Sequence, residues 1–159
     1  MMQRLLINVL LALLWASTIG PFTPMNVGVG FVVGFVVVML SSPKGAKNSY
    51  SRKVFALARF VLYLLWELVR ANGLVAWWTI SPLRRLRPAI VYVPIDPDMT
   101  DAEITTLANV ITLTPGTLTL DVTEDRRALR VHCMHAPDHD AVRREIQHGF
   151  ERRLLEVTR

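Results

Sequence analysis

Apolar residues gather in three long runs in the first half of this chain and alternate with polar residues in the second half. The runs cover residues 5–19, 27–40 and 54–78. As helices, the first two would be about 22 Å and 21 Å long, whereas the hydrocarbon core of a bilayer is about 30 Å thick. With their uncharged flanks included, the pattern predicts two short membrane helices, joined as a hairpin by the Pro-rich segment "GPFTPMN".

Three glycines lie on the second run, and they have two interpretations. Gly28, Gly30 and Gly34 would let the two predicted helices approach closely, because a helix without side chains on one face admits a neighbouring backbone. Simple flexibility is the alternative.

The third run is long enough to span a membrane, but it contains the charged residues Arg59, Glu67 and Arg70. At 100° per residue these fall, with Arg52 and Tyr63, within about one quadrant of a helix. Such a stripe fits a helix in the membrane interface, a spanning helix turned toward a partner, or an ion path.

The basic segment "RRLR" at 84–87 favours an interfacial or steeply tilted third helix. A third full crossing would place this segment outside, against the positive-inside rule, although such a crossing within a larger complex stays open. Trp66, Trp77 and Trp78 would then serve as anchors at headgroup level. Because Glu67 and Arg70 are spaced i, i+3, they can pair, so we interpret Arg59, Glu67 and Arg70 as membrane-depth or interface charges.

The pattern changes from residue 88 onward and predicts a small α+β domain. Residues 88–95 read as a strand, and Thr100 with Glu103 forms a capping box before a helix. Two strands joined by the turn "TEDRR" follow, and a final amphipathic helix begins near Asp138. The order β-α-β-β-α is half-ferredoxin-like. We therefore expect membrane-embedded helices in residues 1–82 and a cytoplasmic α+β domain in residues 83–159.

The segment "NVITLTPGTLTLDV" joins the predicted helix to the next strand. Thr114, Pro115, Gly116 and Thr117 suit a type II turn, with Pro at the second position and Gly, which accepts a positive φ, at the third. We expect these threonines to be exposed near the membrane face, so the turn is a candidate docking surface.

Charge and side-chain chemistry exclude several functions. The net charge is +5, but it is concentrated between the apolar runs, which fits a membrane surface better than nucleic acid. Cys133, with His132 and His135 nearby, lacks the spacing of a metal site. The acidic residues of 96–103 are explained by the start of a helix, and no nucleophile has an evident base partner. We therefore expect neither an enzyme nor a cofactor site.

Basic residues surround the predicted hairpin, with Arg4 before it and four Lys/Arg in "SSPKGAKNSYSRK" after it. The positive-inside rule then places both hairpin ends, and the C-terminal domain, in the cytoplasm. We expect a multi-pass protein of the cell (inner) membrane.

The order of these runs, the "NVITLTPGTLTLDV" segment and the later "VHCMHA" together resemble the E-type subunit of the multisubunit Mrp-type sodium/proton antiporters. The resemblance covers the whole chain and implies a complex of several hydrophobic subunits that exchanges Na⁺ for H⁺. It implies an accessory subunit whose partners are the other subunits and the lipid bilayer, with Na⁺ and H⁺ as the transported ions of the complex. A free-standing, membrane-tethered module that recruits a cytosolic partner is the alternative.

Overall fold

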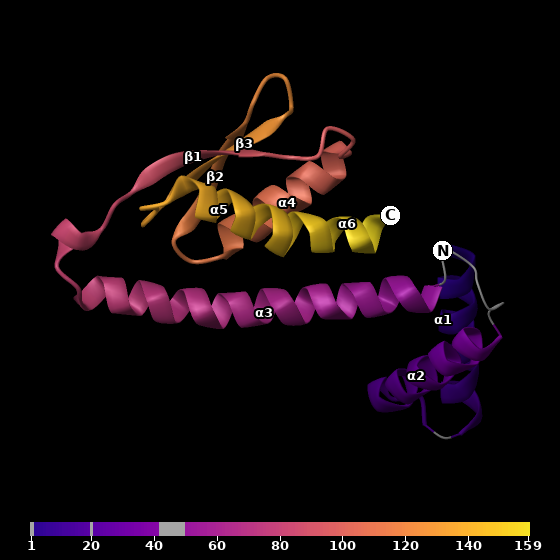
Figure 1. Cartoon of the computed structure of the whole chain (residues 1–159). Helices are drawn as coiled ribbons and strands as arrows, with labels where there is room; N and C mark the ends of the chain where they lie inside the picture. Colours follow the sequence, from indigo (N-terminus) through magenta and orange to yellow (C-terminus); the bar gives the residue numbers. More distant parts are fainter. Residues whose placement is uncertain (1, 20, 42–49) are drawn as a thin grey trace. The chain divides into compact units, whose positions relative to one another are not determined.

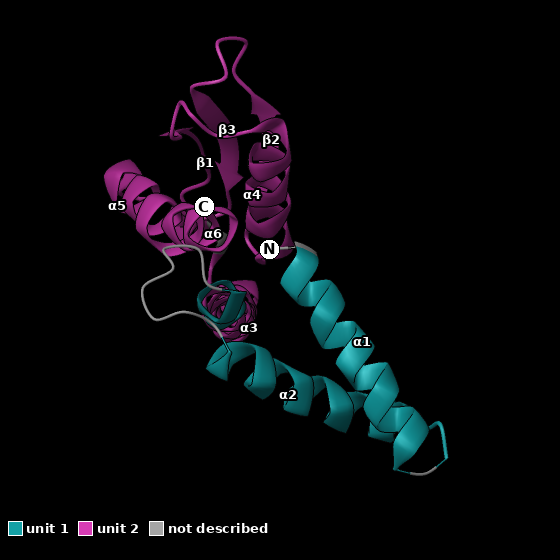
Figure 2. Cartoon of the chain, turned by 90° about the vertical axis from the view of Figure 1, so that its right-hand side faces the viewer, with its two compact units in different colours: residues 1–55 teal, residues 56–159 magenta. Residues whose placement is uncertain are grey.

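The computed structural model describes residues 2–19, 21–41 and 50–159 (Figure 1). By backbone contacts the chain divides into two units, Met1–Phe55 and Ala56–Arg159, which are coloured separately in Figure 2. The sequence predicted a boundary at residue 82 between membrane-embedded helices and a cytoplasmic domain. Backbone contacts do not test where the membrane lies, so this boundary stays a prediction.

The first unit contains a helical hairpin, with α1 at Met2–Thr18 and α2 at Pro24–Leu40. Thr23 caps α2 because its hydroxyl accepts a hydrogen bond from the Asn26 amide, and Pro24 begins the helix, where a missing N–H is tolerated. The two helices coincide with the first two apolar runs, and they pack side by side (Figure 2).

Two of the three glycines on α2 lie where α1 approaches most closely. A Cβ atom on Gly30 would be 2.7 Å from the Ala12 carbonyl oxygen, and one on Gly34 would meet Asn8 Oδ1 and lie 3.0 Å from Leu11 Cβ. Within the described ranges, a Cβ on Gly28 would meet nothing within 4 Å. The close-approach interpretation therefore holds for Gly30 and Gly34, spaced i, i+4, and does not hold for Gly28.

Asn8 is a fully buried polar residue of α1 that the sequence patterns did not single out. Its Nδ2 donates a hydrogen bond to the Tyr50 hydroxyl over 3.2 Å, while its Oδ1 accepts no hydrogen bond from the residues that the structure describes. Tyr50 also packs edge-on against Phe35 of α2, with ring centroids 5.7 Å apart. These contacts join the start of the third helix to the hairpin.

No helix within the described residues combines the length and the apolar character that crossing a membrane requires. The structure thus does not confirm the expected membrane helices.

The second unit confirms the predicted order β-α-β-β-α. Its elements are β1 (Ala89–Pro94), α4 (Asp101–Leu113), β2 (Thr117–Val122), β3 (Ala128–Cys133) and a final helix; a short 3₁₀ turn at Leu83–Arg85 precedes β1. The strands form an antiparallel sheet in the order β1-β3-β2. The capping box holds, since the Thr100 hydroxyl accepts from the Glu103 amide and the Glu103 carboxylate accepts from the Thr100 amide.

The final helix has three parts, namely α5 (His139–Glu145), a π-helical turn at Ile146–Glu151 and α6 (Arg152–Thr158). It begins as predicted, with the Asp138 carboxylate capping the first amides. The π-helical turn was not predicted. It brings Gly149 against α3, where a Cβ atom would collide with the Tyr63 hydroxyl.

Helix α3 spans Tyr50–Ile80 and overlaps the third apolar run. From Ala56 onward it belongs to the second unit, and Phe60 is buried in the same core as the sheet residues Val93, Leu129 and Val131. In both views α3 runs beneath the α+β elements (Figure 1, Figure 2). One side of the third apolar run therefore contributes to the core of the C-terminal unit.

The segment between α4 and β2 is a helix-to-strand connection, as predicted. The Thr117 amide donates to the Thr114 carbonyl over 3.2 Å, and Gly116 has a φ of 91°, as the third position of a type II turn requires. The expectation of exposed threonines was wrong for Thr114, whereas Thr117 is half-buried. Thr114 is buried, with its hydroxyl donating to the Val110 carbonyl, and the Thr117 hydroxyl donates to the Ile111 carbonyl.

The leucines of β2 are exposed instead. Leu118 and Leu120 are 45% and 44% exposed, because helices cover the sheet face on which Thr117 and Thr119 lie. The Thr119 hydroxyl, for example, donates to the Ala108 carbonyl of α4. A register shift between Thr119 and Asp121 then ends the simple alternation.

The contact between α1 and α2 gives a direct test. Gly34→Val should lower the stability of the hairpin by about 1–3 kcal/mol, because the new side chain must displace Asn8 and Leu11. Thermal unfolding in a mild detergent measures this effect, with the protease resistance of the N-terminal unit as the readout. Gly28→Val is the matched control and should leave the midpoint nearly unchanged. Equal midpoints for the two variants would contradict the packing described here.

A candidate docking cleft on the third helix

The charged stripe of α3 faces the final helix of the same chain. Arg59 Nη2 lies 3.3 Å from a carboxylate oxygen of Glu156, and Arg70 forms ion pairs with both Glu67 and Glu145. Between them, Phe60 enters the core. The stripe thus packs against a surface of the chain itself, and the choice among an interfacial helix, a spanning helix turned toward a partner and an ion path stays a prediction.

The centre of the stripe is a group of three charges. The Glu67 side chain is only 7% exposed, and Arg70 donates to it through Nε over 2.8 Å and also through Nη2. Glu145 of α5 takes a further hydrogen bond from the same guanidinium group. A buried carboxylate is costly without a partner, so Arg70 makes the position of Glu67 tolerable and ties α3 to α5.

Tyr63 provides the second link between these helices. Its ring packs edge-on against Phe150, with centroids 5.5 Å apart, and the guanidinium carbon of Arg153 lies 4.0 Å from its centroid. Arg153 is itself held by hydrogen bonds to the carbonyl oxygens of His148 and Gly149. The π-helical turn makes this contact possible, because it places Gly149 beside the ring.

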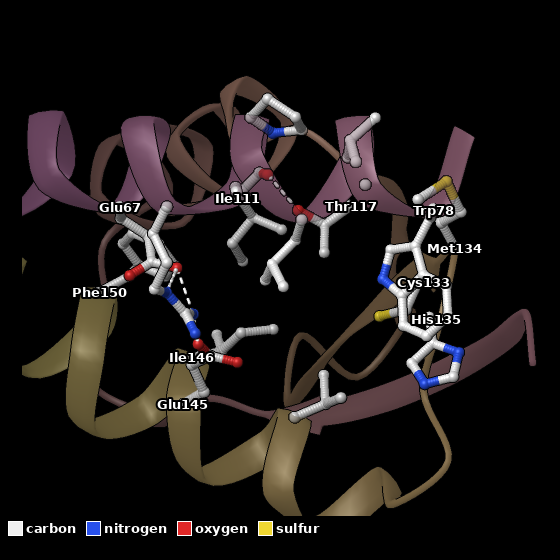
Figure 3. A pocket seen from close by; sticks show the side chains of 17 residues that line it. Glu67, Trp78, Ile111, Thr117, Cys133, Met134, His135, Glu145, Ile146 and Phe150 are labelled. Carbon is white, nitrogen blue, oxygen red and sulfur yellow. Dashed lines mark hydrogen bonds and ion pairs between the residues drawn. The ribbon is translucent and has the colours of Figure 1, made fainter. Parts of the chain in front are cut away.

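A cleft of about 140 Å³ opens beside these contacts (Figure 3). Figure 3 shows Glu67, Glu145 and Phe150 near one end and Trp78 with His135 at the other. Pro115, Gly116 and Thr117 line it from the turn, and Cys133 and Met134 line it from the end of β3. The walls are mostly apolar, with charge only at the Glu67 end.

The cleft brings together most of the residues singled out in the sequence. Glu67 and Arg70 line it together with the three turn residues Pro115, Gly116 and Thr117. The remaining two candidates, Arg59 and Thr114, do not line it: Arg59 lies farther toward the start of α3, and Thr114 is buried. Their joint role as an interface stays a prediction.

Trp78 and His135 form the other end of the cleft. Their ring centroids are 4.2 Å apart, and His135 Nδ1 accepts a hydrogen bond from the Arg87 amide over 3.3 Å. Trp78 is half-buried by this contact, whereas Trp66 and Trp77 are 66% and 58% exposed. Only Trp66 and Trp77 therefore have the free rings that headgroup anchors need.

The cleft is lined by one thiol, that of Cys133. Burial, reinforced by the nearby Glu145 carboxylate, raises the pKa of the Cys133 thiol, so the sulfur is a poor nucleophile at neutral pH. In the part of the chain that the structure describes, no three His, Cys, Asp or Glu side chains gather as metal ligands. What the cleft offers is an apolar surface with a charged end, suited to a side chain or segment of another protein.

Comparisons with known proteins place the chain in a family. The family described as "Na+/H+ ion antiporter subunit" matches residues 8–157. The E-type subunit of the Na(+)/H(+) antiporter from Alkalihalophilus pseudofirmus is 31% identical over 156 residues, which are 98% of each chain.

Two solved complexes contain a similar chain. One is an Mrp complex from Dietzia sp. DQ12-45-1b, with 30% identity, a TM-score of 0.51, and coverage of 65% of this chain and 96% of that chain. The other is the membrane-bound sulfane sulfur reductase, an archaeal respiratory membrane complex, with 25% identity, a TM-score of 0.58, and coverage of 97% and 98%. On this evidence the chain belongs to the family of E-type subunits of Na⁺/H⁺ antiporters.

Proposed function

We propose that this chain is an accessory, structural subunit of a multisubunit membrane antiporter that exchanges Na⁺ for H⁺. It is needed for assembly and exchange, while the main ion path runs through other subunits. Family membership supports the antiporter and its membrane setting. Helix α3 supports the structural role, because one side of it packs into the core of the C-terminal unit while other apolar side chains are exposed.

The observation that carries this proposal is the exposed apolar face of α3. Outside the buried side of the helix, where Phe60, Glu67 and Ala71 lie, large apolar side chains are exposed. They are Leu57, Val61, Leu62, Leu65, Trp66, Val69 and Trp77, each at least 43% exposed. A continuous apolar face of this kind on a folded unit indicates contact with lipid or with other hydrophobic proteins.

The carboxylates that the stripe carries or faces, by contrast, are paired within the chain. Glu67 and Glu145 share Arg70, and Glu156 lies within ion-pair distance of Arg59 and Arg152. An ion path needs carboxylates that can exchange their partners with a passing ion. The shared guanidinium group of Arg70 favours a fixed structural role for Glu67.

The two structural relatives favour the same role. Similar chains occur in an Mrp complex and in a membrane-bound sulfane sulfur reductase, whose names imply different chemistry. A component that serves both complexes with one fold is better explained by scaffolding than by taking part in either reaction.

In this proposal α3 lies along the membrane surface with its apolar face toward lipid and neighbouring subunits. The α1–α2 hairpin inserts with both ends toward the cytoplasm, and the α+β domain is cytoplasmic, as the basic residues around the apolar runs favour. Pro115, Gly116 and Thr117 of the turn, with the charges Glu67 and Arg70, line a docking cleft for a neighbouring subunit, and the buried Thr114 holds the turn through its hydrogen bond to the Val110 carbonyl. Arg59 lies at the edge of this interface.

A free-standing, membrane-tethered module that recruits a cytosolic partner is the competing function. It predicts that the chain purifies alone or with soluble proteins. The antiporter proposal predicts that it purifies in mild detergent with several large polytopic proteins.

A double substitution on the exposed face tests the scaffold role. Leu62→Gln with Val69→Gln should reduce copurification of the large subunits and Na⁺-dependent dissipation of the pH gradient in everted vesicles at least severalfold. Both side chains are about two-thirds exposed, so the fold should persist. The matched control is Leu118→Gln with Leu120→Gln on β2, which should have little effect. Intact exchange in the α3 variant, or in cells that lack the chain, would refute the proposal.

The chain also allows a clean test of orientation. Cys133 is its only cysteine and is 2% exposed, and burial raises the pKa of its thiol, so the native protein should react very slowly with maleimides at pH 7. Glu124→Cys, at the exposed β2–β3 turn, should label with an impermeant maleimide in everted vesicles but not in intact cells. Labelling from outside intact cells would overturn the cytoplasmic placement.

A further inference from the structure

A second concave site lies on the C-terminal unit, away from the docking cleft. It has a volume of about 260 Å³ and lies between the first turns of α3 in this unit and the final helix. Its lining is basic and consists of Ala56, Arg59, His148, Arg152, Arg153 and Glu156. We call it the arginine pocket.

The charge of the arginine pocket is not balanced by its own residues. Three guanidinium groups face one carboxylate, that of Glu156, so the formal charge is positive even with His148 neutral. Glu156 is 3.3 Å from Arg59 Nη2 and 3.4 Å from Arg152 Nε. These are longer than the 2.7–2.9 Å typical of strong charge-assisted bonds. Since each guanidinium has five N–H donors, most remain available to an anion.

The three arginine side chains are held to different degrees, which suits the binding of an anion. Arg153 is fixed by two hydrogen bonds to backbone carbonyls and by the ring of Tyr63. The side chains of Arg59 and Arg152 are 71% and 72% exposed. Exposed ion pairs contribute little to stability, so these two can turn from Glu156 toward a ligand at small cost. The pocket thus has one fixed cation and two adaptable ones.

An apolar strip adjoins the arginine pocket along α3. Leu62 and Trp66 follow Arg59 at i+3 and i+7, on the same side of the helix, and both are 66% exposed. A ligand with a phosphate in the pocket could therefore extend an attached hydrocarbon chain along this strip. Trp side chains such as that of Trp66 are enriched at the level of the lipid headgroups.

We propose that the arginine pocket binds the phosphate of an anionic phospholipid whose acyl chains lie against the exposed face of α3. The guanidinium groups match the planar, bidentate geometry that phosphate oxygens accept, and the neighbouring strip selects a lipid over free phosphate. This site rests on the proposed membrane contact of α3. The site adds a specific lipid to this membrane contact. The lipid would fix the depth of α3 in the membrane interface and the rotation of α3 about its own axis.

Native mass spectrometry of the purified full-length chain in mild detergent tests the site. Titration with phosphatidylglycerol should show one lipid bound in preference to phosphatidylcholine. Arg59→Gln with Arg152→Gln should weaken this binding about tenfold or more, because two cations near the phosphate are lost. The matched control is Arg127→Gln with Arg144→Gln, which removes the same charge outside the pocket and should bind normally. If the double variant unfolds, Arg59→Gln alone serves, since its side chain is largely exposed.

Three results would overturn the proposal. Equal losses in both double variants would mean nonspecific attraction, and equal binding of phosphatidylcholine would mean that the pocket does not distinguish an anionic from a zwitterionic headgroup. Displacement of the lipid by millimolar inorganic phosphate would mean that the pocket takes free phosphate. Because the titration uses the isolated chain, its failure is separable from a failure of subunit copurification, which tests the scaffold role.

Discussion

Arg70 holds two carboxylates at once, that of Glu67 on its own helix and that of Glu145 on α5. This contact fixes which face of α3 turns toward the α+β domain, together with the Tyr63 ring against Phe150 and Gly149. Because the charged face packs against the α+β domain, the apolar face of the same helix is left exposed. The docking cleft, the arginine pocket and the proposed membrane contact all follow from that orientation.

The arrangement separates two tasks along one helix. The inward stripe joins α3 to a folded domain, as its buried Phe60 shows, and the outward face is left for hydrophobic surroundings. A small domain has a marginal core, and Phe60, Tyr63 and Leu64 of α3 enlarge it. The domain therefore depends on the helix for its core, and the helix depends on the domain to satisfy its charges. Such mutual dependence suits a subunit that positions other proteins.

Local signals in the sequence predicted much of the fold. The capping box of Thr100 and Glu103, the Asp138 cap and the type II turn at Gly116 each depend on neighbouring residues, so short-range rules suffice. The contact of α1 with Gly30 and Gly34 could be proposed from spacing, but not the absence of contact at Gly28. Whether Gly28 touches α1 depends on where the two helices cross.

Long-range packing decided the features that the sequence did not predict. The partner of the charged stripe lies about 75 residues away, and nothing near Arg70 points to Glu145. The π-helical turn at Ile146–Glu151 has no sequence signature, although it sets the Tyr63 contact. The inward-facing threonines of β2 break the rule that apolar side chains are buried, because they satisfy carbonyl oxygens of α4. In each case tertiary contacts outweighed the local pattern.

Helix α3 turns its charged stripe toward its own domain, and we propose that its apolar face meets lipid or neighbouring subunits. Electron paramagnetic resonance with single nitroxide labels at successive positions from 61 to 72, in a Cys133→Ala background within reconstituted complex, measures this directly. We expect accessibility to oxygen to be greatest at Leu62, Leu65 and Val69, with low accessibility to both oxygen and a water-soluble nickel reagent at Glu67 and Ala71. Maximal nickel accessibility at Tyr63, Glu67 and Arg70 would place the stripe on a water-filled path and contradict this orientation.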